Sequence, residues 1–249
     1  MIEIKGLCAG YGSKEVLKDL SLNIEKGSLT SLIGINGSGK STLLKAASGI
    51  ISYTGGTVTV DGKDIRSYRR GSLAKRVSYL SQWNNAPDMT VFELVLQGRF
   101  PHLSFPRSYS AEDRSIAESA LSEVGISHLK DSRLSSLSGG TRQLAYLAMS
   151  LTQNTDYILL DEPTTYLDIS NRLSLMKLLR KVRDGGRGVL TVMHELPIAL
   201  TYSDKIALIS EGRVVNFGTP IEIYESGDIE KNFGVSIKYE SGEFFHKLT

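Results

Sequence analysis

The segment that most constrains this chain is residues 34–42, which read G-I-N-G-S-G-K-S-T. It fits the pattern G-x-x-x-x-G-K-[ST], whose glycines let successive backbone N–H groups point at phosphate oxygens. In this pattern Lys40 reaches the β- and γ-phosphates, and the Ser41 hydroxyl holds Mg²⁺. Residues 28–33 predict a buried strand, and 41–47 predict a helix whose N-terminus faces the phosphates. The segment therefore predicts a nucleotide site, and a chance match by a Gly/Ser-rich turn is the alternative.

An acidic pair follows another apolar run further along the chain. Residues 157–160 predict a buried parallel strand, and Asp161 and Glu162 come directly after it. Parallel sheets place their ligands at the carboxyl ends of the strands. We expect Asp161 to hold Mg²⁺ opposite Ser41, and Glu162 to polarise an attacking water. A solvated pair of acids in a loop is the alternative.

The segment 137–143 reads L-S-G-G-T-R-Q and fits the pattern L-S-G-G-x-x-Q. Ser138 predicts a capped helix N-terminus, and the two glycines after it leave backbone N–H groups open to an anion. By itself Ser-Gly-Gly is also compatible with a simple turn. Its position upstream of the acidic strand end makes the pattern specific.

The order of strand and helix patterns predicts a parallel α/β core with a helical insertion. The core takes residues 1–83 and 156–218, and the insertion takes 84–155. Residues 219–249 are weakly patterned and are interpreted as a C-terminal tail.

Helix-start signals support the helical character of the insertion. Thr90 can cap a helix over 91–97. Ser110 and Asp113 resemble a capping box that opens a second helix, which Gly125 is well placed to end.

Composition is that of an ordinary globular protein, with 249 residues, 41% hydrophobic and 22% charged. The formal charge of +2 does not by itself indicate nucleic-acid binding, and we expect no nucleic-acid partner. Cys8 is the only cysteine, so no disulfide can form within the chain. No signal-peptide pattern opens the chain, and no apolar run approaches the roughly 20 residues needed to cross a bilayer. We therefore expect a cytoplasmic protein that associates with a membrane only through a partner.

Together these motifs resemble those of the ATP-binding-cassette (ABC) ATPases, the nucleotide-binding subunits of ABC transporters. The resemblance covers roughly residues 2–220, with the motifs in the family's order. It implies a P-loop NTPase fold of the ABC-ATPase type, in which one domain over 1–249 adds an antiparallel β subdomain and a helical insertion to the α/β core. It also assigns a stacking aromatic, a glutamine loop, a D-loop and a switch histidine, which fall on Tyr11, Gln82, 165–168 and His194.

The resemblance implies a role for each matching residue, with ATP and Mg²⁺ as cofactors. The catalytic positions are Lys40, Gln82, Glu162 and His194. The magnesium positions are Ser41, Gln82 and Asp161. The nucleotide contacts are Tyr11, Asn36, Gly37, Ser38, Gly39, Lys40, Ser41, Thr42, Ser138, Gly139, Gly140, Gln143 and Asp168.

The resemblance also implies partners. Two copies pair head to tail, so that each ATP lies between the phosphate loop of one copy and 138–140 of the other. Separate membrane permease subunits complete the transporter, and a substrate-binding protein acts with them indirectly. The chain is then peripheral on the inner face of the cell membrane.

Two segments narrow the resemblance to a subfamily. Residues 163–168 and 98–102 resemble the ATPases of bacterial importers for iron–siderophore, haem or cobalamin. Phe100 departs from the more usual Tyr, Glu195 replaces the commoner Asp after the histidine, and Leu144 stands where many relatives carry Arg. An exporter ATPase and a soluble ABC ATPase outside transport remain the alternatives.

The insertion carries apolar residues between prolines: Phe100, Leu103 and Phe105. These suit the groove of a partner, and packing inside the insertion is an equally open alternative. The other three histidines, His102, His128 and His246, are interpreted as surface or packing residues.

Overall fold

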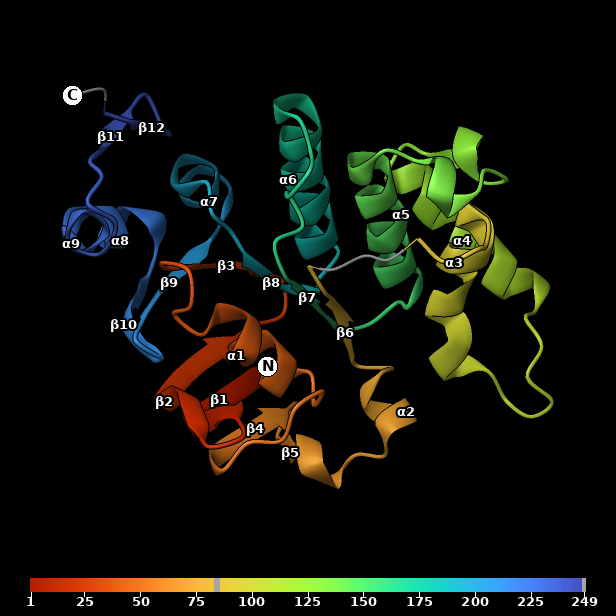
Figure 1. The fold of residues 1–249 in the computed structure, drawn as a ribbon, viewed down its shortest axis with the longest axis horizontal. Helices are drawn as coiled ribbons and strands as arrows, with labels where there is room; N and C mark the ends of the chain where they lie inside the picture. The colour runs from red at the N-terminus through yellow and green to blue at the C-terminus, as the bar shows by residue number, and fades with distance from the viewer. Residues whose placement is uncertain (83–85, 248–249) are drawn as a thin grey trace.

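The computed structural model describes residues 1–82 and 86–247, so the boundary expected between 83 and 84 lies outside the described residues. Within those ranges the strands form a large, mostly parallel sheet, a smaller antiparallel sheet and a short hairpin (Figure 1). The large sheet has the order β10-β9-β3-β8-β7-β6, and the smaller one has the order β2-β1-β4-β5. The strands are β1 (Ile2–Tyr11), β2 (Lys14–Ile24), β3 (Leu29–Ile33), β4 (Gly55–Val60), β5 (Lys63–Asp64), β6 (Val77–Leu80), β7 (Tyr157–Leu160), β8 (Gly188–Val192), β9 (Lys205–Ser210), β10 (Arg213–Gly218), β11 (Ile237–Glu240) and β12 (Glu243–His246).

The parallel strands are buried on both faces, which explains their continuous apolar runs. Side chains alternate between the faces. Tyr157 and Leu159 of β7 join the hydrophobic cluster made with the antiparallel sheet and α1 (Lys40–Ala47). Ile158 and Leu160 join the cluster made with the helices on the other side. The helices are α1, α2 (Arg70–Leu73), α3 (Val91–Leu96), α4 (Ala111–Glu123), α5 (Gly139–Thr152), α6 (Ile169–Asp184), α7 (Leu196–Tyr202), α8 (Pro220–Glu225) and α9 (Asp228–Phe233).

The antiparallel sheet confirms the N-terminal strands and corrects their length. The sequence pattern by itself predicts only short strands here, over 2–7 and 19–24. The structure instead shows a long β1–β2 hairpin that closes at Tyr11 and Lys14, with register shifts along its length. Such shifts let a strand bend while its pairing continues.

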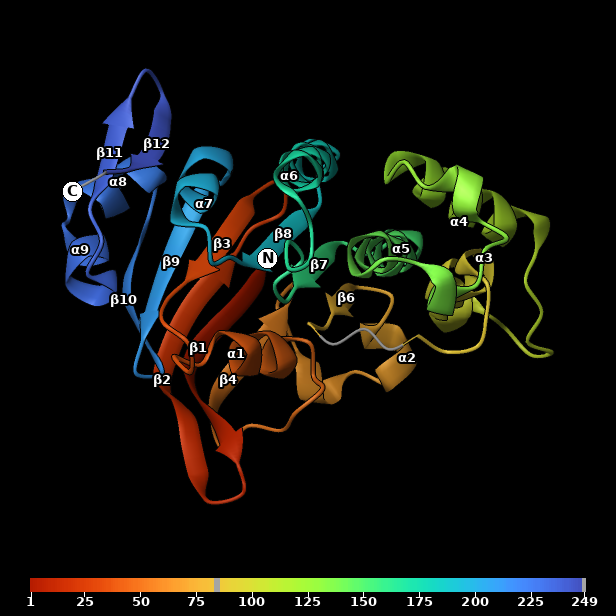
Figure 2. The ribbon, with the colours of Figure 1, turned by 45° about the horizontal axis from the view of Figure 1, so that its top comes forward.

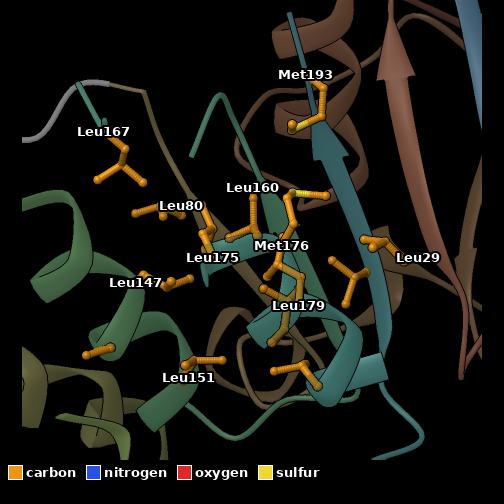
Figure 3. Packing of buried hydrophobic residues seen from close by; sticks show 14 of the residues in the cluster. Leu29, Leu80, Leu147, Leu151, Leu160, Leu167, Leu175, Met176, Leu179 and Met193 are labelled. Atoms are coloured by element: carbon orange, nitrogen blue, oxygen red, sulfur yellow. The ribbon is translucent and has the colours of Figure 1, made fainter. Parts of the chain in front are cut away.

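The helices α3, α4 and α5 lie together at one end of the molecule (Figures 1 and 2). The predicted caps are present: Thr90 with Glu93, and Ser110 with Asp113, each form a complete capping box. This part shares its core with the sheet, since Leu147 and Leu151 of α5 belong to the same cluster as Leu160 of β7 (Figure 3).

The C-terminal segment is folded rather than unpatterned. The helices α8 and α9 lead into the β11–β12 hairpin, at the opposite end from α4 (Figure 2). The backbone N–H of Phe244 donates to the Thr201 hydroxyl at 3.3 Å, and the Phe244 ring packs edge-on against Tyr224. Among the described residues, no helix is long and apolar enough to span a membrane.

Candidate nucleotide-binding site

The phosphate loop connects the end of β3 to the start of α1 and closes around Lys40. The Lys40 ammonium donates to the carbonyl oxygens of Gly34 at 2.7 Å and Ile35 at 2.9 Å. A side chain at Gly34 would overlap the Ile209 carbonyl oxygen, and Gly39 has a φ of 110°, which favours glycine. Burial lowers the pKa of Lys40, while the nearby charges of Glu162 and Asp161 oppose that shift.

A pocket of about 270 Å³ lies over this loop. It brings together most of the predicted phosphate contacts with Glu162. It also includes two residues of β2 that the sequence analysis missed, because strand pairing alone places them there. The lining residues are Lys14, Val16, Asn36, Gly37, Gly39, Lys40, Ser41, Thr42 and Glu162.

Two hydroxyl groups donate to the Asp161 carboxylate beside the pocket. The Ser41 hydroxyl donates to Asp161 Oδ1 at 2.9 Å, and the Tyr79 hydroxyl donates to Asp161 Oδ2 at 3.2 Å. Asp161 is buried at the end of β7, and burial raises its pKa against the lowering effect of these hydrogen bonds. Carboxylate and hydroxyl oxygens are ligands that suit Mg²⁺, which uses one or two protein groups together with substrate phosphates. The pair Ser41 and Asp161 therefore fits a magnesium ion.

Glu162 lies at the centre of a cluster of predicted catalytic residues. Its Oε1 is 2.6 Å from His194 Nε2, and its Oε2 accepts from the Gln82 amide at 2.6 Å. The Thr165 hydroxyl also donates to Oε2, at 3.3 Å. Glu162 has a positive φ of 53°, which is uncommon for a residue with a side chain. The tertiary structure thus joins residues from three separate parts of the sequence, at 82, 162–165 and 194.

The segment 137–143 forms the start of α5. Ser138 accepts from the Thr141 backbone N–H at 3.2 Å, and Ser138 and Gly139 are exposed. A side chain at Gly140 would meet the Tyr166 carbonyl oxygen, so the glycines lie against the D-loop. None of these residues lines the phosphate pocket of this copy, as far as the described ranges show.

The remaining predicted contacts lie apart from the pocket. Gln143 is buried in α5, and the Asp168 carboxylate accepts from the Asn171 backbone N–H at 2.8 Å and so caps α6. The Tyr11 ring is 48% exposed and pairs across the hairpin with Lys14, which lines the pocket. It also lies 6.0 Å from the Lys45 ammonium.

Comparison with known proteins agrees with this geometry. Residues 17–165 match the family model described as "ABC transporter". The iron(3+)-hydroxamate import ATP-binding protein FhuC of Bacillus subtilis is 40% identical over 228 residues, which cover 91% of this chain and 85% of that protein. The ferric enterobactin transport ATP-binding protein FepC of Escherichia coli is 40% identical over 231 residues, covering 92% and 85%. The petrobactin import ATP-binding protein YclP of B. subtilis is 37% identical over 243 residues, covering 97% and 96%.

Solved structures show the same fold. An ABC transporter in an inward-facing conformation superposes with a TM-score of 0.83 at 26% identity, over 100% of this chain and 96% of that one. A dimeric bacterial ABC transporter cassette gives a TM-score of 0.79 at 28% identity, over 88% and 99%. The phosphate loop, the acidic strand end and these similarities agree, and the chain belongs to the ABC transporter family as one of its ATP-hydrolysing, ATP-binding subunits.

Proposed function

We propose that this chain hydrolyses ATP with Mg²⁺ to energise a bacterial importer of iron–siderophore complexes. The observation that carries the proposal is the position of Glu162. Its carboxylate lines the phosphate pocket and is held between Gln82 and His194. A carboxylate in that position can accept a proton from a water that attacks the terminal phosphate.

The proposed chemistry depends on positioning and electrostatics, as phosphoryl transfer generally does. Lys40 would neutralise charge on the β- and γ-phosphates, and Ser41 with Asp161 would hold Mg²⁺. The ion would neutralise further phosphate charge when bound. His194 would orient Glu162 and contact the γ-phosphate, while Gln82 fixes the second carboxylate oxygen.

A second copy completes the site in this proposal. The exposed Ser138 and Gly139 present a helix N-terminus, which attracts anions. Beside them Tyr166 is 69% exposed, and Ile169 is also exposed, as expected for surfaces covered by a partner. The dimeric cassette among the similar structures supports a pair of copies, which we propose to be head to tail.

The names of the relatives support the substrate class, since FhuC, FepC and YclP are named for hydroxamate, enterobactin and petrobactin import or transport. We therefore favour iron–siderophore complexes over haem and cobalamin, and import over export. The partners would be membrane permease subunits and, indirectly, a substrate-binding protein. The chain would then lie on the cytoplasmic face of the membrane, bound to the permease.

A strain that lacks this gene provides the test. Complementation with the wild-type gene should restore uptake of ⁵⁵Fe supplied as a ferric siderophore, and Lys40→Ala should not. Lys75→Ala, an exposed lysine outside the pocket, is the matched control and should restore uptake fully. Unchanged ferric-siderophore uptake in the deletion strain would contradict the proposed substrate class, and export of a compound by the complemented strain would favour the exporter alternative.

A further inference from the structure

Tyr79 contacts Asp161, the residue whose carboxylate is predicted to hold Mg²⁺. It contacts one carboxylate oxygen, and Ser41 contacts the other. Tyr79 lies on β6, one strand away from Asp161, and its hydroxyl donates to Asp161 Oδ2 at 3.2 Å. The other oxygen, Oδ1, is the one that faces Ser41. The Asp161 backbone N–H also donates to the Leu80 carbonyl, at 2.9 Å. Asp161 is therefore fixed to β6 by its backbone and by one side-chain oxygen, while the second oxygen stays directed at the phosphate loop.

The alternation of β6 explains why a tyrosine can reach this position. Ser78 and Leu80 point to the helical side of the sheet, where the Ser78 hydroxyl accepts from Ser150 at 3.1 Å. Tyr79 points to the other side and packs with the cluster around α1. On that face the Tyr79 hydroxyl meets the carboxylate of Asp161, a residue that is 2% exposed.

The same ring has a second environment. It lines a groove of about 470 Å³ between the end of α1, α2 and β6, together with Ile50, Arg70 and Leu73. Tyr79 thus separates this groove from the metal-binding side of Asp161. A shift of the ring from within the groove would move the hydroxyl that holds Oδ2.

We infer that Tyr79 is a positioning residue, which orients the Asp161 carboxylate so that Oδ1 remains available to Mg²⁺. The inference rests on the proposed nucleotide and magnesium site and adds a residue to it. Groups that hydrogen-bond to a metal ligand fix its orientation, and their loss typically costs roughly 10- to 100-fold in metal affinity. Without the Tyr79 hydroxyl, the carboxylate could rotate and offer its oxygens less favourably.

Tyr79→Phe tests this, because it removes one hydroxyl and keeps the ring that lines the groove. Binding of a fluorescent ATP analogue is measured as MgCl₂ is titrated, and again in EDTA. The Mg²⁺ concentration for half-maximal binding should rise about 10-fold in the variant, while binding in EDTA stays unchanged. The matched control is Tyr68→Phe, which removes a hydroxyl that donates to the Val60 carbonyl at 3.1 Å, away from the site.

The outcomes separate a positioning role from a structural one. An unchanged Mg²⁺ requirement in Tyr79→Phe overturns the inference, and so does an equal loss of binding in EDTA, which would indicate a general defect. Thermal unfolding of the metal-free variant shows whether it is folded. If wild-type protein binds the analogue without any Mg²⁺ dependence, the proposed magnesium site fails, and this inference fails with it.

Discussion

His194 Nε2 lies 2.6 Å from Oε1 of Glu162, although the two residues belong to different strand ends of the parallel sheet. Because this contact, together with Gln82, directs the carboxylate at the pocket, Glu162→Gln should abolish proton acceptance and keep the shape. We expect hydrolysis to fall by about 10²- to 10⁴-fold, as for loss of a general base. A phosphate-release assay measures this directly, and a fully active variant would remove Glu162 from the mechanism.

The same substitution should trap a dimer. Ser41 and Asp161 are intact in Glu162→Gln, so ATP with Mg²⁺ still binds and joins two copies. Size-exclusion chromatography should show this dimer with ATP·Mg²⁺ and not with ADP. Asp161→Asn is the matched comparison, since it should weaken Mg²⁺-dependent binding and give no dimer. A dimer of equal strength in both variants would contradict the separate roles.

Tyr11 is expected to stack on the adenine base. Tyr11 is 48% exposed and ends β1, where it pairs with Lys14 of β2, a residue that lines the pocket. Tyr11→Ala should therefore weaken ATP binding by about 1 kcal/mol, the value of an aromatic pair, and Tyr11→Trp should be tolerated. Fluorescence titration gives both affinities, and equal affinity for Tyr11→Ala and the wild type would end this hypothesis.

The exposed aromatics of the insertion favour partner docking over internal packing. Phe105 is 97% exposed and Phe100 is 50% exposed. Phe100→Ser and Phe105→Ser should abolish ferric-siderophore uptake and leave the ATPase rate of the isolated subunit within about twofold of the wild type, because neither contacts the pocket. If folding and ATPase activity were lost together with uptake, the packing alternative would be correct.

Gly98 lies against the C-terminal end of α5, where an added side chain would overlap the Met149 carbonyl oxygen. Gly98→Ala should lower the free energy of unfolding by about 1–3 kcal/mol, as overpacking does. Gly71→Ala is the matched control, since a side chain added at Gly71 in α2 would point into open space among the described residues. Gly71→Ala should raise the free energy of unfolding by up to about 1 kcal/mol, because alanine favours the helix more than glycine does. Urea denaturation measures both, and equal effects would contradict the close approach.

Acid should lower the stability of the helical insertion, because protonation of Asp113 weakens its ion pair with Arg99. The Arg99 guanidinium, at 2.8 Å, is the main cause that lowers the pKa of Asp113 from 3.8 to about 2. Because the folded-state pKa lies below the unfolded-state pKa, the ionised Asp113 carboxylate stabilises the folded protein above about pH 4. This contribution is lost as the pH falls toward 2. Asp113→Asn should therefore show a shallower fall in unfolding free energy between pH 5 and pH 3 than the wild type. Parallel pH profiles for the two proteins would contradict this.

Several features of this protein follow from the sequence by itself. The phosphate loop over 34–42 could be predicted because its glycines and Lys40 are close together in the sequence. The backbone geometry of the loop therefore depends on adjacent residues. The capping boxes at Thr90 and Ser110 are equally local, since each joins residues three positions apart. The acidic strand end and the 137–143 helix start were also predictable, because a buried strand and a capped helix have recognisable patterns.

Only the tertiary structure decided which distant residues share the site. The order β3-β8-β7-β6 brings the ends of these strands side by side, and so places His194, Glu162 and Gln82 in contact. Lys14 reaches the pocket through hairpin pairing, and Tyr79 reaches Asp161 from the neighbouring strand β6. Residues 219–247 gain structure in the same way, since the backbone N–H of Phe244 donates to the Thr201 hydroxyl of α7. Such contacts depend on sheet order and register, which strand patterns do not specify, because any two buried strands can pair with similar energy.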